Sequence, residues 1–267
     1  MTRNTLLLAT LAAMFSIGCS TNNSSGAAVD LGVVEDAGAD TGTTEDAGPV
    51  ACEPGTVTCI DQSLVMLDLF ETVSPAAITE EGTTEGEFST LVDASGGGFN
   101  PTQSYVYARF TDTGLVKVDV DDEAAFTSTD WDIAFRRYVV RLNSGVAGPS
   151  CTEGARTAPG TTFDSLTDVP SDLAYHVEQY FTESCDYVPD GSGIGAPGTV
   201  LSSFWTYPGC VSMSGYVYVI ALANGRHVKF QVLSYYPPEI QAMCEESGTV
   251  PMPSGAGAMR VRWAFLD

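Results

Sequence analysis

Histidine and cysteine often act as catalytic groups or metal ligands. This 267-residue chain has only two histidines but seven cysteines. The sequence contains no Gly-x-Ser-x-Gly nucleophile motif, no His-Glu-x-x-His zinc motif and no phosphate-binding loop. Two histidines far apart in sequence offer little to a nucleophilic or zinc-dependent site. We therefore predict a protein that is not an enzyme.

The two histidines differ in their surroundings. His227 begins an alternating run in which it shares one face with Lys229 and Gln231, which predicts a solvated strand face. His176 shares a face with Glu178 and a tyrosine, and it remains a candidate for ligand contact. A third group, the acids of residues 119–123, has oxygen ligands that calcium prefers, but it lacks the EF-hand spacing, so a solvated turn is the favoured interpretation.

Six of the cysteines follow residue 50, and an even number in an exported chain indicates three disulfides rather than metal ligands or a catalytic thiol. Six cysteines allow fifteen pairings. The sequence Glu-Pro-Gly-Thr-Val-Thr, a natural turn, separates the first two, which predicts that these two pair locally. The six are Cys52, Cys59, Cys151, Cys185, Cys210 and Cys244.

The N-terminus predicts export. Arg3 precedes an apolar run, Leu6 to Ile17, that is too short to span a bilayer, and residues 1–18 are predicted to be a signal peptide. Ser-Ile-Gly-Cys resembles a lipobox with Cys19 as the lipidated residue, and Ser20 resembles the outer-membrane sorting pattern. A secretory signal with an incidental cysteine is the alternative. The prediction is a lipid anchor on the outer membrane, facing the periplasm or the cell surface.

Two further segments follow the signal. Residues 19–50 contain six acids, no base and no aromatic residue, so we predict a disordered acidic tether. Residues 51–267 are predicted to form one domain with 28 acids and ten bases, a net charge near −18. Such a field repels phosphates and argues against nucleic acid as a partner.

Strand patterns dominate this domain. Alternating apolar residues separated by turns rich in Gly, Pro, Asn and Asp predict an all-β fold of two packed, mostly antiparallel sheets, held by disulfides. Asn224-Gly225 predicts a hairpin. Short helical turns are expected within 63–71 and 237–243. The predicted strands are Tyr105–Phe110, Leu115–Val120, Trp131–Leu142, Tyr175–Phe181, Tyr216–Leu222, His227–Tyr236 and Met259–Leu266.

Several of these segments carry a family resemblance. The run from Trp131 to Gly145, Trp-Asp-Ile-Ala-Phe-Arg-Arg-Tyr-Val-Val-Arg-Leu-Asn-Ser-Gly, resembles the signature of the HmuY family of bacterial haem-binding lipoproteins. Asp168-Val-Pro-Ser-Asp172, the late hairpin with Asn224-Gly225, and the last strand follow in the family's order. The resemblance spans roughly residues 128–267 and implies an HmuY-like fold and haem binding.

The same resemblance suggests where ligands of a haem iron would lie. Relatives take one axial ligand from the loop after the Val-Pro-x-Asp strand and the other from the aromatic stretch before the late hairpin. Neither stretch contains histidine here. Candidate ligands are therefore Met213 or Tyr207 on one side and His176 or Tyr187 on the other.

Three arginines, at 136, 137 and 141, lie within the Trp131 motif. A buried arginine needs a partner, which Asp132 and other acids can provide, so a structural ion-pair framework is the favoured interpretation. The alternative is that an arginine, Arg137 among them, pairs with haem propionates.

Together these observations predict a non-catalytic lipoprotein that binds haem or another small ligand at the outer membrane. The alternative is a surface interaction or scaffold lipoprotein that keeps the fold, contacts a protein partner and binds no haem.

Overall fold

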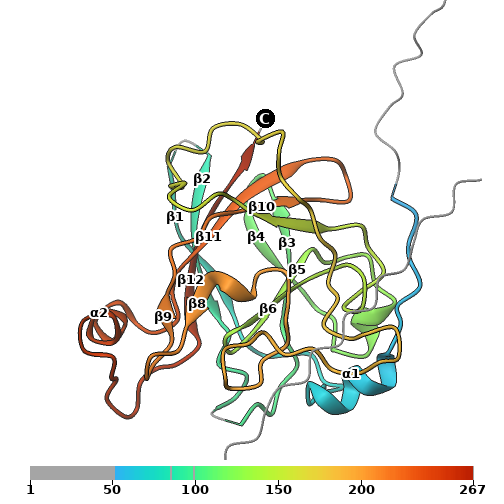
Figure 1. Cartoon of the computed structure of the whole chain (residues 1–267), viewed down its shortest axis with the longest axis horizontal. Coiled ribbons are helices and arrows are strands. Elements are labelled where there is room, and N and C mark those ends of the chain that lie inside the picture. Colours follow the sequence, from blue (N-terminus) through green and yellow to red (C-terminus); the bar gives the residue numbers. More distant parts are fainter. Residues whose placement is uncertain (1–51, 85, 99, 267) are drawn as a thin grey trace, which may run out of the picture. The chain divides into compact units, whose positions relative to one another are not determined.

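The computed structural model describes residues 52–84, 86–98 and 100–266, and it is built mainly from two antiparallel sheets with few helices (Figure 1). The predicted all-β class is confirmed. The signal peptide, Cys19 and the acidic tether lie outside the described residues. Within the described ranges, no helix has the length and apolar character needed to cross a bilayer.

The strands are ordered as follows. The six-stranded sheet runs β1 (Ile78–Thr84), β2 (Glu87–Asp93), β12 (Ala258–Leu266), β11 (His227–Ser234), β10 (Tyr218–Ala221) and β7 (Glu153–Arg156). The four-stranded sheet runs β4 (Gly114–Val118), β3 (Val106–Thr111), β5 (Ile133–Arg136) and β6 (Val139–Leu142). A short hairpin joins β8 (Trp205–Thr206) to β9 (Ser212–Met213). The helices are α1 (Ile60–Met66) and α2 (Pro238–Ser247), with short 3₁₀ turns at Ala124–Phe126 and Ser202–Phe204.

The main core lies between the two sheets. Phe110 of β3 meets Phe230 of β11 edge-on at 6.3 Å and Trp263 of β12 at 5.0 Å, measured between ring centroids. Phe135 of β5 lies 6.5 Å from Phe230. These rings come from alternate positions of their strands, so the period-2 pattern of the sequence directs them to one side. The prediction of two packed sheets is therefore confirmed.

The Asn-Gly hairpin is also confirmed, because β10 and β11 pair antiparallel across it. The predicted solvated face of β11 is wrong for Lys229, which is buried. Its ammonium lies 3.3 Å from a Glu87 carboxylate oxygen and 4.4 Å from the centre of the Phe163 ring. A long loop that carries Phe163 covers this second face of the sheet, and alternation within β11 could not reveal such a cover.

The predicted strand over 131–142 is wrong in its length, because it is a hairpin of β5 and β6. The turn consists of Arg137, with φ +54°, and Tyr138. The Arg137 amide donates a hydrogen bond to the carbonyl of Ala94 at 2.5 Å. Neither residue is typical of a tight hairpin turn, where Asn, Asp and Gly prevail, and this explains the missed turn. The turn presents both side chains at one end of the small sheet.

The segment 175–181 is not a strand. It makes isolated bridges at His176 and Phe181, with irregular backbone between them. The Glu178 amide donates to the Ser144 hydroxyl at 3.2 Å, and the Glu178 carbonyl accepts from the Val146 amide at 3.0 Å. The Ser144 side chain and the Val146 backbone thus satisfy the amide and carbonyl of Glu178, which in a strand would bond to a neighbouring strand.

All six described cysteines form disulfides, as predicted, but the local pair is wrong. The pairs are Cys52–Cys151, Cys59–Cys185 and Cys210–Cys244. Residues 53–58 do not close a turn: the Gly55 amide donates to the Pro149 carbonyl at 2.7 Å, so the segment runs along a distant loop. Two disulfides therefore fasten the start of the domain to loops about a hundred residues away.

A buried polar network lies on the outer side of the small sheet. Asp122 is fully buried and accepts from the amides of Phe70 (3.0 Å) and Tyr105 (2.9 Å) and from the hydroxyl of Tyr107 (2.8 Å). Its carboxylate also lies 3.6 Å from the Arg136 guanidinium. The predicted solvated turn is thus wrong for Asp122. The sequence suggested Asp132 or another acid as the partner of a buried arginine, and for Arg136 that partner is Asp122. Asp132 instead accepts from the Phe110 amide at 2.9 Å.

Arg141 completes this network. It is almost fully buried, donates to the Tyr107 hydroxyl at 2.7 Å, and its guanidinium lies 3.9 Å from the centre of the Tyr105 ring. Guanidinium groups bind well over aromatic faces when they are removed from water. The structural interpretation of the motif arginines holds for Arg136 and Arg141, while Arg137 faces a different region.

Candidate functional site

An open cleft of about 540 Å³ lies beside the β5–β6 turn, and we call it the aromatic cleft. It falls within the size range of small-molecule and cofactor sites. A second hollow of about 210 Å³ adjoins it, because Arg137 and Tyr138 line both. The aromatic cleft is lined by Gly98, Arg137, Tyr138, Ile194, Tyr207, Val211, Tyr235, Tyr236, Val250, Met252, Pro253, Ser254 and Ala256.

Aromatic packing holds the walls in place. The Tyr138 ring lies 5.0 Å from Trp205 of β8 and 6.3 Å from Tyr235, which follows β11. Tyr235 meets Tyr236 edge-on at 4.8 Å, and Trp205 meets Tyr207 at 6.5 Å. The cleft is therefore walled by rings from three segments far apart in sequence, each supported by another ring.

Helix α2 fixes this wall from behind. The side-chain carbonyl of Gln241 accepts from the amides of Tyr235 (2.9 Å) and Tyr236 (3.2 Å). Glu245 accepts from the Met213 amide at 2.8 Å, and the Cys210–Cys244 disulfide joins the β8–β9 loop to the helix. Figure 1 shows α2 beside β9 at the end of the large sheet. The polar face of α2 thus sets the position of the tyrosine pair.

Exposed apolar side chains gather at this cleft. Met252 is 83% exposed, Tyr207 47% and Ile194 36%, and all three line it, while Met66, 52% exposed, lines the adjoining hollow. Scattered apolar residues on a surface are ordinary, but a contiguous group around a concavity indicates binding. The cleft is therefore the best candidate for a site that takes an apolar ligand.

Two groups at the cleft, the Arg137 guanidinium and the Tyr235 hydroxyl, are of a kind that binds a carboxylate of such a ligand. The Arg137 guanidinium lies 5.8 Å from the centre of the Tyr235 ring and 3.5 Å from the carbonyl of Ala256. The Tyr235 hydroxyl is buried and has no hydrogen-bond partner in the described part of the chain. Burial raises the pKa of Tyr235, so this hydroxyl stays protonated and able to donate. A buried donor without a partner is rare and costly, and a ligand oxygen would satisfy it.

The family model described as HmuY protein matches residues 101–245, more than half of the chain. The chain belongs to the HmuY family. This match includes the β5–β6 turn, Tyr207 and the tyrosine pair, while Met252 lies beyond it.

Several solved structures from bacteria are similar to this HmuY-family chain. A Bacteroides fragilis protein described as a lipoprotein is 17% identical with a TM-score of 0.44, over 69% of this chain and 92% of that one. A Bacteroides vulgatus protein described as HmuY-like and haem-binding is 18% identical with a TM-score of 0.43, over 70% and 96%. The apo HmuY analogue of Tannerella forsythia is 14% identical with a TM-score of 0.37, over 75% and 99%. No curated protein sequence matches this chain.

The structure places the five predicted haem-site residues in different regions. Arg137 and Tyr207 line the aromatic cleft, and Tyr187 lines the adjoining hollow, where its hydroxyl donates to the Gly195 carbonyl at 2.8 Å. His176 lies instead in a polar hollow of about 450 Å³ that also contains Arg156. Met213 pairs with Trp205 in the β8–β9 hairpin, packs on the main core and does not line the cleft.

Sequence reasoning missed Met252 and treated Tyr235 and Tyr236 only as part of the hairpin resemblance. A signal for Met252 does exist, since it lies between Pro251 and Pro253 in a segment without strand or helix pattern. An apolar side chain held in a proline-rich surface loop gains nothing from a core. Such a residue is a natural candidate for ligand contact.

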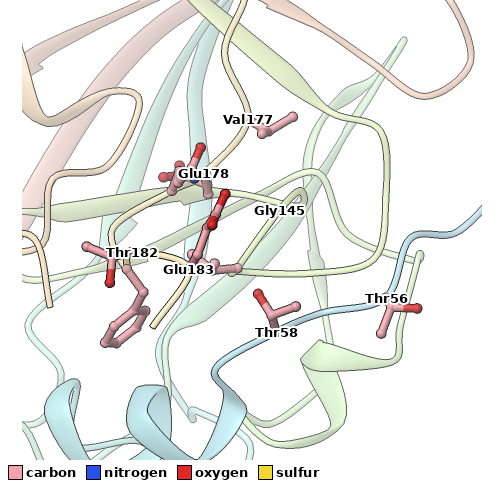
Figure 2. Close-up of a pocket in the computed structure, with 10 residues that line it drawn as sticks. Thr56, Thr58, Gly145, Val177, Glu178, Thr182 and Glu183 are labelled. Carbon is pink, nitrogen blue, oxygen red and sulfur yellow. The ribbon is translucent and has the colours of Figure 1, made fainter. Parts of the chain in front are cut away.

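Another pocket of about 390 Å³ lies near the N-terminal disulfides and is unlike the cleft. Figure 2 shows Thr56 and Thr58 on the N-terminal segment, with Thr182 and Glu183 across the pocket. Three threonines and two glutamates are among the labelled residues, and none of the five predicted haem-site residues lies there. Within the described ranges, no group of three His, Cys, Asp or Glu side chains is placed to hold a metal ion.

Proposed function

We propose that this HmuY-family chain is a non-catalytic lipoprotein that binds haem in the aromatic cleft. The observation that carries the proposal is the cleft itself, which combines tyrosine walls with Arg137 and a buried hydroxyl that lacks a partner. Family membership and the relatives described as haem-binding or as lipoproteins support the same reading.

The residues of the cleft fit the two chemical demands of this ligand. Tyrosine rings bury an apolar macrocycle at roughly 25 cal/mol per Å² of apolar surface removed from water. Arg137 and the Tyr235 hydroxyl would receive carboxylates, and a guanidinium suits them because it donates in a planar fork. In a domain with a net charge near −18, such a local cation is needed to offset the repulsion of an anionic ligand. Haem, when bound, supplies an iron that accepts axial side-chain ligands.

The test is a hemin titration followed by the Soret band. The unaltered protein should bind saturably, and Tyr138→Ala should bind more weakly, because it removes the ring that both hollows share. Tyr216→Ala is the matched control, since Tyr216 is a partly buried tyrosine that packs on Arg156 outside the cleft. Circular dichroism would establish that both variants fold.

Two outcomes would contradict the proposal in different ways. Equal affinities for the two variants would mean that the haem site lies elsewhere. Association that does not saturate in the unaltered protein would remove haem as the ligand and favour the scaffold alternative.

The lipid anchor rests on sequence alone and has its own experiment. Cys19→Ala should move the protein from the membrane fraction to the soluble fraction and abolish its incorporation of labelled fatty acid. Ser20→Asp is a second variant. It should keep the lipid and move the protein from the outer membrane to the inner membrane. A Cys19→Ala protein that still carries lipid would show that the signal is not a lipobox.

A further inference from the structure

We infer that Tyr207 and Met252 are the two side chains that ligate the iron of a haem bound in the aromatic cleft. This inference rests on the proposed function and deepens it by naming the ligands. It departs from the expectation from sequence, which offered Met213 or Tyr207 on one side of the haem and His176 or Tyr187 on the other.

Elimination within the described residues is the first step. All six cysteines are held in disulfides, His176 lies in a separate polar hollow, and His227 packs beside Tyr175, 6.0 Å between ring centroids. None of these side chains lines the cleft. Iron ligation in the cleft must therefore come from a phenol oxygen or a thioether sulfur.

Among the phenols that line the cleft, Tyr207 is the best suited. Burial raises the pKa of Tyr138, Tyr235 and Tyr236, which opposes the phenolate form that ferric iron prefers. The Tyr236 hydroxyl is also engaged, since it accepts from the Val211 amide at 3.1 Å. Tyr207 is about half exposed, and the structure gives its hydroxyl no hydrogen-bond partner in the described chain.

Met252 is the thioether of the same cleft. It is 83% exposed, more than any other large apolar side chain described, so its sulfur is not engaged in a core. The other methionines of the described ranges are placed differently: Met213 and Met259 contribute to the main core, Met243 lies on α2, and Met66 lines the adjoining hollow. Thioethers are soft ligands that haem iron accepts in other proteins. Met252 and Tyr207 thus both line one aromatic cleft with exposed side chains, and they supply a thioether and a phenol for the iron.

The experiment compares two porphyrins, hemin and iron-free protoporphyrin IX, on the full chain. Binding is followed by the Soret band and by quenching of tryptophan fluorescence, because Trp205 packs against both Tyr138 and Tyr207. The variants are Tyr207→Phe and Met252→Leu, which keep the ring and the apolar volume and remove only the ligating atom. Matched controls are Met213→Leu and Met243→Leu, at methionines that do not line the cleft.

We expect each test variant to weaken hemin binding by about tenfold or more, since groups that merely orient a metal ligand contribute about 10- to 100-fold. Each should also alter the ferric absorption spectrum. The affinity for protoporphyrin IX should stay unchanged, and the two control variants should bind hemin like the unaltered protein. Unaltered protein that binds hemin no better than protoporphyrin IX would overturn the inference and leave a porphyrin site.

Other results separate the inference from the proposed function. If the unaltered protein binds hemin saturably while either test variant keeps its spectrum and affinity, the ligand pair is wrong and haem binding stands. A changed hemin spectrum in Met213→Leu, with an unchanged one in Met252→Leu, would likewise show that the ligand pair is wrong while haem binding stands. If neither porphyrin binds saturably, the proposed function fails together with the inference.

Discussion

Asp122→Ala is expected to lower the free energy of unfolding by about 3 to 5 kcal/mol, because it leaves the buried Arg136 without its anion. It also leaves the amides of Phe70 and Tyr105 and the hydroxyl of Tyr107 without an acceptor. Each such unsatisfied buried donor costs roughly 1 to 3 kcal/mol in isolation, and neighbouring terms do not add. Urea unfolding followed by tryptophan fluorescence measures the loss.

Two further variants sharpen this test. Asp122→Asn keeps the shape but removes the charge, and its amide nitrogen would face a donor, so it should lose nearly as much stability as the alanine variant. Asp119→Ala is the matched control: Asp119 lies three residues earlier and is mostly exposed, and among the described residues its ion pair is with Lys117, at 3.6 Å. Exposed pairs contribute little. Similar losses for Asp119→Ala and Asp122→Ala would contradict the role assigned to the buried network.

Glu178 is expected to make the protein less stable as the pH rises from about 4.5 to about 7. Burial raises the pKa of Glu178 to about 7, although the amides of Leu142 (2.9 Å) and Val200 (3.1 Å) donate to its two oxygens. Because the folded state holds this proton more tightly than the unfolded state, its stabilising effect is complete below the unfolded pKa. This stabilisation is lost as the pH rises through the pKa of the folded state. The loss is roughly 3 kcal/mol, since each unit of difference between the folded and unfolded pKa corresponds to about 1.4 kcal/mol.

Glu178→Gln tests this directly. The variant should remove that part of the pH dependence, and below pH 4.5 it should be less stable than the unaltered protein, because its amide nitrogen faces one of the two donating backbone amides. Glu183→Gln is the control, because Glu183 lines the same pocket as Glu178 but is exposed to solvent (Figure 2). Urea unfolding at several pH values gives the difference between the curves. Parallel curves for Glu178→Gln and the unaltered protein would show that Glu178 does not titrate in this window.

The strands that the sequence predicts correctly are those with strong alternation and a clear turn between them, such as β10 and β11 around Asn224-Gly225. The turn at Arg137 and Tyr138 was not predicted because neither residue is typical of a tight hairpin turn. Segment 175–181 alternates like a strand, yet its backbone bonds to Ser144 and Val146. Local pattern cannot distinguish these cases, since the deciding partners lie some thirty residues away in sequence.

The candidate site was harder to predict than the fold for a related reason. The family resemblance directed attention to Tyr207 and Arg137, and both line the cleft. Met252 joins them only because the loop after α2 returns to the β5–β6 turn, more than a hundred residues away in sequence. His176 satisfies the chemistry of an iron ligand by residue type, but its backbone pairs with Gly154 in another hollow. Residue type predicts which side chains are able to bind iron, whereas the topology of the fold determines which of them lie in the cleft.

The two disulfides at the start of the domain have a mechanical consequence. If the chain is held at a membrane through Cys19, any drag on the domain pulls on it through Cys52. That force passes directly through covalent bonds into the loop at Cys151, and then at Cys59 into the loop at Cys185. Residues 53–58, which make few backbone hydrogen bonds, therefore cannot be peeled from the domain one contact at a time. Traction on the anchor would therefore be shared between two loops, and the loop after Cys185 carries it on to Tyr187 and Ile194, which line the aromatic cleft and its adjoining hollow.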